Sequence, residues 1–287
     1  MLDQIGRKCI GIDQLDAAFL DAARAKLSGL DLTDYAMLAR SIKEPEEISL
    51  TIEAAKFADL FLTRLHAVAG DIINQGGTEL DLMTDAKGHT YNALMAKHKK
   101  TFASTPMGIT ASVHSGPRAA LPHGAVLERR PKPGDTLIAG IGASLGGYHA
   151  ESGVTLIVGD ISQEQKKIMT AMQECNDAGV EACAKRLTCT AVNDAALDAL
   201  HAADLGDAIR HRIGHGMGLQ GHEAPWLSPG DDTQVETNMV FSNEPGVYRP
   251  DFDGYRTINT MIVTEAGMHV PSRFQSMTAI NARVIAV

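Results

Sequence analysis

The order of helical and strand-like segments repeats once along this 287-residue chain. Residues 44–73 carry apolar side chains at three- and four-residue spacings, which predicts a long amphipathic helix, and residues 78–98 predict a second one. Residues 106–159 then change to short β-rich stretches interrupted by Gly and Pro. The same order returns, with two helices predicted within 162–206 and strands within 238–274. This order predicts an α+β fold in which two similar helix–helix–strand halves share one sheet.

Local signals set the expected ends of these helices. Pro45, followed by acidic residues, suits a helix N-terminus. Thr78 and Ser162 are candidate N-caps, and Glu164 lies near the capping-box position of the second. Residues 125–130 (AVLERR) are predicted as one of the strands. The first 40 residues are short and mixed, with a strand-like CIGI and then a helix-like LDAAFLDAARAKL.

Composition and charge exclude several classes of protein. The formal net charge of -9 is spread along the chain, and KHKK at 97–100 is too short for a nucleic-acid footprint. The sequence contains no run of about 18 apolar residues, the length that a membrane span needs. The N-terminus lacks the apolar region of a signal peptide. The four cysteines show no CxxC spacing, which indicates buried thiols in a reducing compartment. We therefore expect a cytoplasmic protein without nucleic-acid or membrane partners.

The stretch GHGMGLQGHEAP, residues 214–225, is the strongest candidate for a functional site. His211 and His215 have the four-residue spacing of a helical metal site, but the glycines around His215 argue against a helix. His222 follows seven residues later, and Glu223 and Glu244 add acidic groups nearby in the sequence. Because ordered glycines cost backbone entropy, their clustering indicates that the backbone must pass close to something.

These motifs resemble those of the creatinase, prolidase and methionine aminopeptidase family. GHGMGLQGHEAPWL, NMVFSNEPGVY and DGYRTINTMIVTEAG resemble its closing half, and SIKEPEEISLTIEAAKFAD resembles its opening helix. ALPHG resembles its first active-site motif, and GDTLIAGIGASLGGYHAESGVTLIVG its central hairpin. The resemblance implies a pita-bread fold with a curved, mostly antiparallel sheet. It implies a catalytic domain over residues 41–287, preceded at 1–40 by a lead-in or the remnant of a truncated N-terminal domain.

The resemblance also implies a site, from which this chain departs at two positions. Metal-dependent members hold two ions with five ligands, and three of these positions fall on Glu151, His215 and Glu244. The other two fall on Gly140 and Ile258, which cannot ligate. We therefore expect no metal cofactor. The alternative is one divalent cation (Mn, Co or Zn) held by the three surviving residues.

The leading hypothesis is a metal-independent, creatinase-like hydrolase that cleaves a C–N bond of a small amino-acid-derived substrate. His123, in ALPHG, would move the proton, because an imidazole titrates near neutral pH. Glu151 and Glu244 would bind a cationic substrate or orient a water. His222 would act with these three as a catalytic residue. His215 and Arg256 would bind the substrate, the latter by pairing with its carboxylate.

Two other functions stay open. One is a metal-dependent Xaa-Pro dipeptidase or aminopeptidase. The motifs HEAPW and FSNEPGVY resemble those of such enzymes more closely than those of creatinase. The other is a non-catalytic peptide-binding pseudo-peptidase, suggested by Gly153 and Val154, which stand where related hairpins often carry an acid and an arginine. The expected partners are a small-molecule or dipeptide-like substrate and a second copy of the chain in a homodimer.

Overall fold

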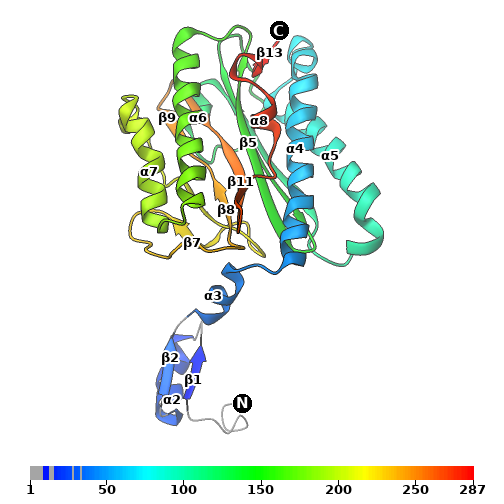
Figure 1. Cartoon of the computed structure of the whole chain (residues 1–287). Helices are drawn as coiled ribbons and strands as arrows, with labels where there is room; N and C mark the ends of the chain where they lie inside the picture. The colour runs from blue at the N-terminus through cyan, green and yellow to red at the C-terminus, as the bar shows by residue number, and fades with distance from the viewer. Residues whose placement is uncertain (1–8, 13–15, 28, 33) are drawn as a thin grey trace.

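The computed structural model describes residues 9–12, 16–27, 29–32 and 34–287. Its N-terminal part contains strand β1 (Cys9–Ile12), helix α2 (Ala17–Lys26) and strand β2 (Gly29–Leu32), and the two strands pair in parallel. Helix α3 (Tyr35–Ser41) connects this part to the main body. The N-terminal part stands apart from the main body (Figure 1). The predicted strand at CIGI and the helix after it are thus confirmed.

Two long helices, α4 (Pro45–Asn74) and α5 (Glu79–Phe102), open the main body. Helix α4 begins with a capping box between Glu44 and Glu47 and has Pro45 in its first turn. Helix α5 begins at the N-cap Thr78, whose hydroxyl accepts from the backbone N–H of Asp81. Both helices therefore start where the sequence predicts.

The second helical pair is α6 (Gln163–Ala184) and α7 (Cys189–Ala202). Ser162 caps α6 as predicted, but its capping-box partner is Gln165 rather than Glu164, because the box requires the third residue after the cap. The three cysteines whose side chains are described, Cys175, Cys183 and Cys189, are buried and free, as the sequence predicts for them. Nothing is described of the side chain of Cys9.

The strands form one mostly antiparallel sheet of nine strands in the order β3-β4-β5-β11-β8-β6-β7, with β12 paired to β11 and β13 paired in parallel to β5. A separate hairpin joins β9 to β10. The strands are β3 (Gly108–Ser115), β4 (Thr136–Leu145), β5 (Tyr148–Val158), β6 (Gly214–Gly216), β7 (Glu223–Leu227), β8 (Val240–Asn243), β9 (Gly246–Arg249), β10 (Asp253–Arg256), β11 (Ile258–Thr264), β12 (Gly267–His269) and β13 (Val284–Ile285).

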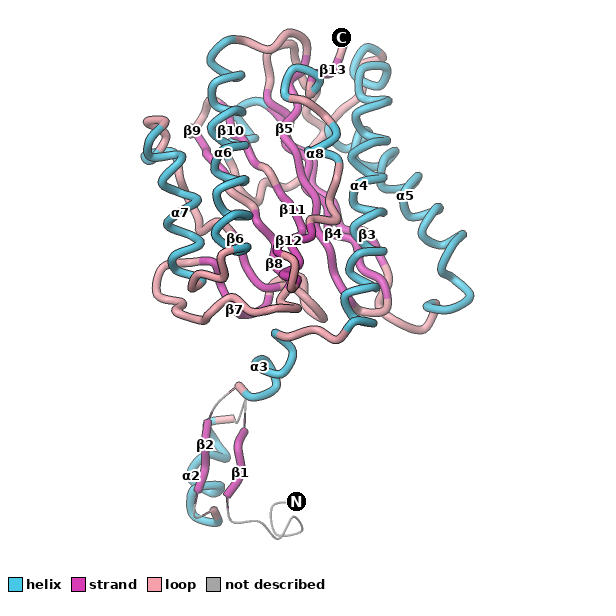
Figure 2. The backbone as a smooth tube through the Cα atoms, viewed as in Figure 1, coloured by secondary structure: helices cyan, strands magenta, loops and turns pink. Residues whose placement is uncertain are grey.

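Each half has its own hydrophobic core. The first lies between α4, α5 and the strands β3 to β5. The second lies between α6, α7 and the strands that include β8 and β11. The helices flank the sheet in two pairs, with α4 and α5 at one side and α6 and α7 at the other (Figure 2). The expected α+β fold with two helix–helix–strand halves is confirmed.

The alternation of side chains along β4 and β5 decides which face of the sheet carries the pocket. Ala139 and Ile141 of β4, and Val154 of β5, belong to the core under α4 and α5. Gly140 lies one position from both β4 residues and Glu151 lies three positions from Val154, so both belong to the opposite face, where they line a pocket.

One predicted strand is wrong. Residues 125–130 run through an irregular segment with no strand pairing in the described structure. Its carbonyls instead meet the start of α5: the backbone N–H of Glu79 donates to Arg129 and that of Leu80 donates to Leu127. The hydrogen bonds that a strand would need are thus taken by a helix N-terminus. Residues 268–274 form a strand only as far as His269, and helix α8 (Phe274–Met277) follows.

Candidate functional site

A cavity of about 260 Å³ opens on the face of the sheet opposite α4 and α5. Five of the six residues singled out from the sequence line it, namely His123, Glu151, His222, Glu244 and Arg256. The sixth, His215, is fully buried directly beside it, within ion-pair distance of two of those residues. Positions far apart in the sequence therefore converge on one site.

His215 is the middle residue of strand β6, and the glycines on each side of it do not form a helix, as predicted. A side chain at Gly214 would overlap the carbonyl of Ser242, and one at Gly216 would approach the carbonyl of Ala224 to 2.7 Å. These glycines let β6 pack closely between β8 and β7. Close packing of the backbone therefore explains both glycines and fixes the place of His215.

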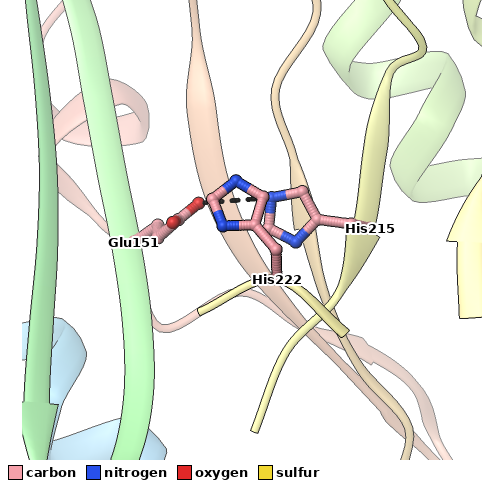
Figure 3. A group of neighbouring side chains, drawn as sticks. All are labelled: Glu151, His215 and His222. Carbon is pink, nitrogen blue, oxygen red and sulfur yellow. Dashed lines mark ion pairs between the residues drawn. The ribbon is translucent and has the colours of Figure 1, made fainter. Parts of the chain in front are cut away.

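The imidazole of His215 faces two carboxylates. Its Nδ1 lies 3.0 Å from the Gly216 carbonyl, which assigns the proton to that nitrogen. Its Nε2 lies 3.3 Å from Oε1 of Glu244. The same nitrogen lies 3.7 Å from Oε2 of Glu151, the pair marked by the dashed line in Figure 3. Although Nε2 is buried, no described residue forms a hydrogen bond with it. A buried polar atom beside two acids without a hydrogen bond is a position at which a cation could bind.

The charges of this cluster are strongly coupled. Burial raises the pKa of Glu151, while the nearby imidazole of His215 opposes that rise. Burial also disfavours the charged form of Glu244, but His215 and Arg256 outweigh it and bring its pKa to about 2. Burial lowers the pKa of His215, and the two acids reverse this so that the net pKa is raised. The site therefore holds an anionic carboxylate and favours positive charge at the imidazole.

His222 stacks on His215, with ring centroids 4.0 Å apart and planes inclined by 28°. Figure 3 shows both rings beside the carboxylate of Glu151. One nitrogen or oxygen atom from each of these three residues lies within 4.8 Å of the others. Burial, followed by the charge of His215, lowers the pKa of His222. A neutral imidazole in this position can bind a cation or accept a proton from a substrate.

His123 and Arg256 form the opposite wall. His123 lies in a turn, as predicted, and is exposed to the pocket side. Nη1 of Arg256 donates to the carbonyl of Pro122, the residue before His123, at 2.6 Å. The buried carboxylate of Glu79 supports the same loop, since it pairs with Arg118 and accepts from the N–H of Ser115. Arg256 therefore joins the pocket to the His123 turn.

Gly140, Gly153 and Ile258 are neighbours across β4, β5 and β11. Their packing accounts for the two positions, 140 and 258, that cannot ligate a metal. Gly153 pairs with Gly140 on one side and with Ile258 on the other. A side chain at Gly153 would lie 2.6 Å from Cδ1 of Ile258, and one at Gly140 would lie 2.8 Å from Nη2 of Arg256. The side chain of Ile258 thus covers Gly153, and the guanidinium of Arg256 occupies the space beside Gly140. The departures at these positions form one packed arrangement.

Some site residues carry no recognisable signal in the sequence. Ser242 donates to Oε2 of Glu151 at 2.8 Å, and Thr260 accepts from the backbone N–H of Glu151 at 2.8 Å. Ser242 precedes Glu244 by two residues, so strand alternation could have placed both on the pocket face. His211 bonds instead to Tyr248 and to the Arg212 carbonyl, so it does not join the cluster of His215.

The residues of this cluster could hold one divalent cation, and one ligand atom each from Glu151, His215 and His222 lies within 4.8 Å of the others. Glu151, His215 and Glu244 offer two carboxylates and an imidazole, which are common ligands of catalytic metals with an open position. The Gly216 carbonyl fixes the tautomer that leaves Nε2 free to ligate. A second ion bound through positions 140 and 258 does not fit, because one residue has no side chain and the other is apolar.

The chain is similar to a known protein family over most of its length. The profile of metallopeptidase family M24 matches residues 50–265. The "Probable dipeptidase PepE" of Mycobacterium tuberculosis is 33% identical over 236 residues, which are 82% of this chain and 59% of that protein. The Xaa-Pro dipeptidase of Pyrococcus furiosus is 30% identical over 228 residues, which are 79% of this chain and 62% of that protein. The chain thus spans less than two thirds of the length of these curated relatives.

A solved structure shows the same fold. Dipeptidase PepE from Mycobacterium ulcerans superposes with a TM-score of 0.81 at 27% identity, covering 100% of this chain and 74% of that one. The expected pita-bread fold is confirmed. These relatives are dipeptidases by name, so they give no support to the metal-independent, creatinase-like hypothesis, and the dipeptidase alternative fits them better. Among the described residues, no helix has the length and apolar character needed to cross a membrane.

Proposed function

Because this chain belongs to metallopeptidase family M24, we propose that it hydrolyses the C–N bond of a dipeptide-like substrate with one divalent cation. The cation is held by Glu151, His215 and Glu244. Manganese, cobalt and zinc are the candidate ions, since mixed carboxylate and imidazole ligands suit them. The proposal replaces the metal-free expectation with its single-cation alternative.

One observation carries this proposal above the others. Nε2 of His215 is buried between Glu151 and Glu244 without a hydrogen bond from any described residue. The two carboxylates would repel each other without a positive charge between them. A bound divalent ion satisfies all three groups and, when present, polarises a carbonyl and lowers the pKa of a water.

The surrounding residues divide naturally into those that bind the substrate and those that move its protons. Arg256 lies in the pocket wall and can pair with the carboxylate of a dipeptide. His123 lines the same pocket and would hand a proton to the leaving nitrogen, a step that imidazole side chains commonly carry out. His222 stacks over the cation ligand His215 and can hold the substrate carbonyl. Each of these roles is open to mutation.

The proposal is tested by measuring hydrolysis of a panel of dipeptides, Xaa-Pro among them, before and after treatment with a chelator. We expect chelation to abolish hydrolysis and Mn²⁺, Co²⁺ or Zn²⁺ to restore it. Activity that survives complete removal of metal would return the chain to the creatinase-like hypothesis. Absence of hydrolysis with every ion, together with retained peptide binding, would favour a peptide-binding module.

A further inference from the structure

A buried ion-pair cluster joins the segment before the family region to the loop that carries His222. Arg40, at the end of α3, and Lys43, in the connection to α4, both lie before residue 50, where the family match begins. Nη2 of Arg40 pairs with Oε2 of Glu223, and Nζ of Lys43 lies 3.1 Å from Oε1 of the same residue. Two cations from outside the matched region thus hold the neighbour of His222.

The cluster is too buried to be an incidental surface contact. The Glu223 side chain is fully buried and that of Lys43 is 2% exposed, whereas Arg40 keeps 30% exposure. Burial lowers the pKa of Lys43, and Glu223 opposes this shift. Removing one partner of a buried pair leaves an unpaired charge in a poorly polar environment, which is strongly unfavourable. Lys43 and Glu223 therefore depend on each other, and Arg40 adds a second, partly exposed cation to the pair.

Glu223 also organises the loop in front of it. Its Oε2 accepts from the backbone N–H of Gln220 at 3.1 Å, within the glycine-rich segment. A side chain at Gly218 would come within 2.5 Å of Oε1 of Glu223 and 3.0 Å of Cε of Lys43. The carbonyl of Gly218 in turn accepts from the backbone N–H of His149 on β5 at 3.0 Å. The loop between β6 and β7 is thus fixed at both sides of His222.

We propose that Glu223 is a positioning residue for His222. Through their ion pairs with Glu223, Arg40 and Lys43 make the segment before residue 50 contribute to the geometry of the pocket. His222 is itself exposed to the pocket and has its ring stacked on His215, so its place depends on the loop that carries it. The ion pairs of Glu223 with Arg40 and Lys43 hold that loop in place. The activity readout of this inference rests on the proposed function, whereas its structural readout does not.

The test is a double-mutant cycle between Glu223→Gln and His222→Ala, measured as kcat/KM for a hydrolysed dipeptide. Alone, Glu223→Gln should lower kcat/KM about 10- to 100-fold, the range seen when residues that orient a ligand are lost. In the His222→Ala background the same change should cost less than about threefold. Equal losses in both backgrounds would overturn the inference, because Glu223 would then act on the fold rather than on His222.

A second pair of variants guards against a Glu223→Gln protein that does not fold. Arg40→Met removes the half-exposed cation and leaves the Lys43–Glu223 pair, while Arg40→Lys restores a charge. We expect Arg40→Met to lower kcat/KM and Arg40→Lys to recover most of it. Asp85→Asn, which breaks the Arg64–Asp85 pair between α4 and α5, is the matched control and should leave kcat/KM unchanged.

An NMR measurement decides the inference even if no dipeptide is hydrolysed. The imidazole signals of His222, identified by their loss in His222→Ala, should shift in Glu223→Gln and Arg40→Met but not in Asp85→Asn. Unchanged His222 signals in folded Glu223→Gln or Arg40→Met protein would overturn the inference. Shifted signals in an inactive wild type would uphold it while the proposed function fails.

Discussion

Replacing His215 by Ala should remove the bound cation and lower kcat/KM for dipeptide hydrolysis about a thousandfold, since a Lewis-acidic ion supplies several kcal/mol and each 1.4 kcal/mol is about tenfold. Its Nε2 lies between Glu151 and Glu244, 3.7 and 3.3 Å from their carboxylate oxygens. Without it the two carboxylates face each other and no longer define one site. Calorimetric titration with Mn²⁺ should show that high-affinity binding is lost.

His211→Ala is the matched control for this variant. His211 lies four residues away and has its own partners in Tyr248 and the Arg212 carbonyl, outside the carboxylate cluster. We expect its replacement to leave the stoichiometry of Mn²⁺ binding unchanged. A His215→Ala protein that keeps both its ion and its activity would contradict the assignment of His215 as a ligand.

Replacing His123 by Ala should lower kcat about 10²- to 10⁴-fold, the usual contribution of a positioned general acid or base. His123 lines the pocket from a turn that Arg256 fixes through the Pro122 carbonyl. It is separate from the ligand cluster, so Mn²⁺ affinity should stay at the wild-type value. Rates at saturating substrate, together with the calorimetric titration, measure the two quantities independently.

His89→Ala provides a histidine substitution away from the pocket. His89 is exposed on α5 and lines no part of the cavity. Its loss should change neither kcat nor ion binding. If His123→Ala and His89→Ala behaved alike, His123 would carry no proton in the reaction.

The helices could be predicted from the sequence because their signals are local. Thr78 and Ser162 cap α5 and α6, and the apolar period of residues 44–73 matches the buried face of α4. Residues 125–130 could not be predicted in the same way. Their apolar and basic composition resembles a strand, yet their carbonyls accept from the start of α5, a contact across about 50 positions that no local pattern reveals.

The candidate site could be located from its motifs, but the residues that hold the site residues in place could not be predicted. His123, Glu151, His222, Glu244 and Arg256 line one cavity. The sequence also shows that the residues at positions 140 and 258 cannot ligate a metal.

The physical meaning of these departures is visible only in the sheet register. The Ile258 side chain occupies the space above Gly153, while Val154 points to the other face, into the core under α4. The glycine and the isoleucine are thus complementary, and the valine does not reach the pocket. The cluster of Arg40, Lys43 and Glu223 is equally invisible in the sequence, because it joins residues about 180 positions apart.

The number of divalent ions bound per chain tests the single-cation site most directly. Elemental analysis of purified protein after saturation with Mn²⁺ and removal of excess ion should find one ion in the wild type. The Gly140→Asp/Ile258→Glu variant places a carboxylate at both positions that cannot ligate in the wild type, so two ions are expected there. Two ions in the wild type, or none, would contradict the account.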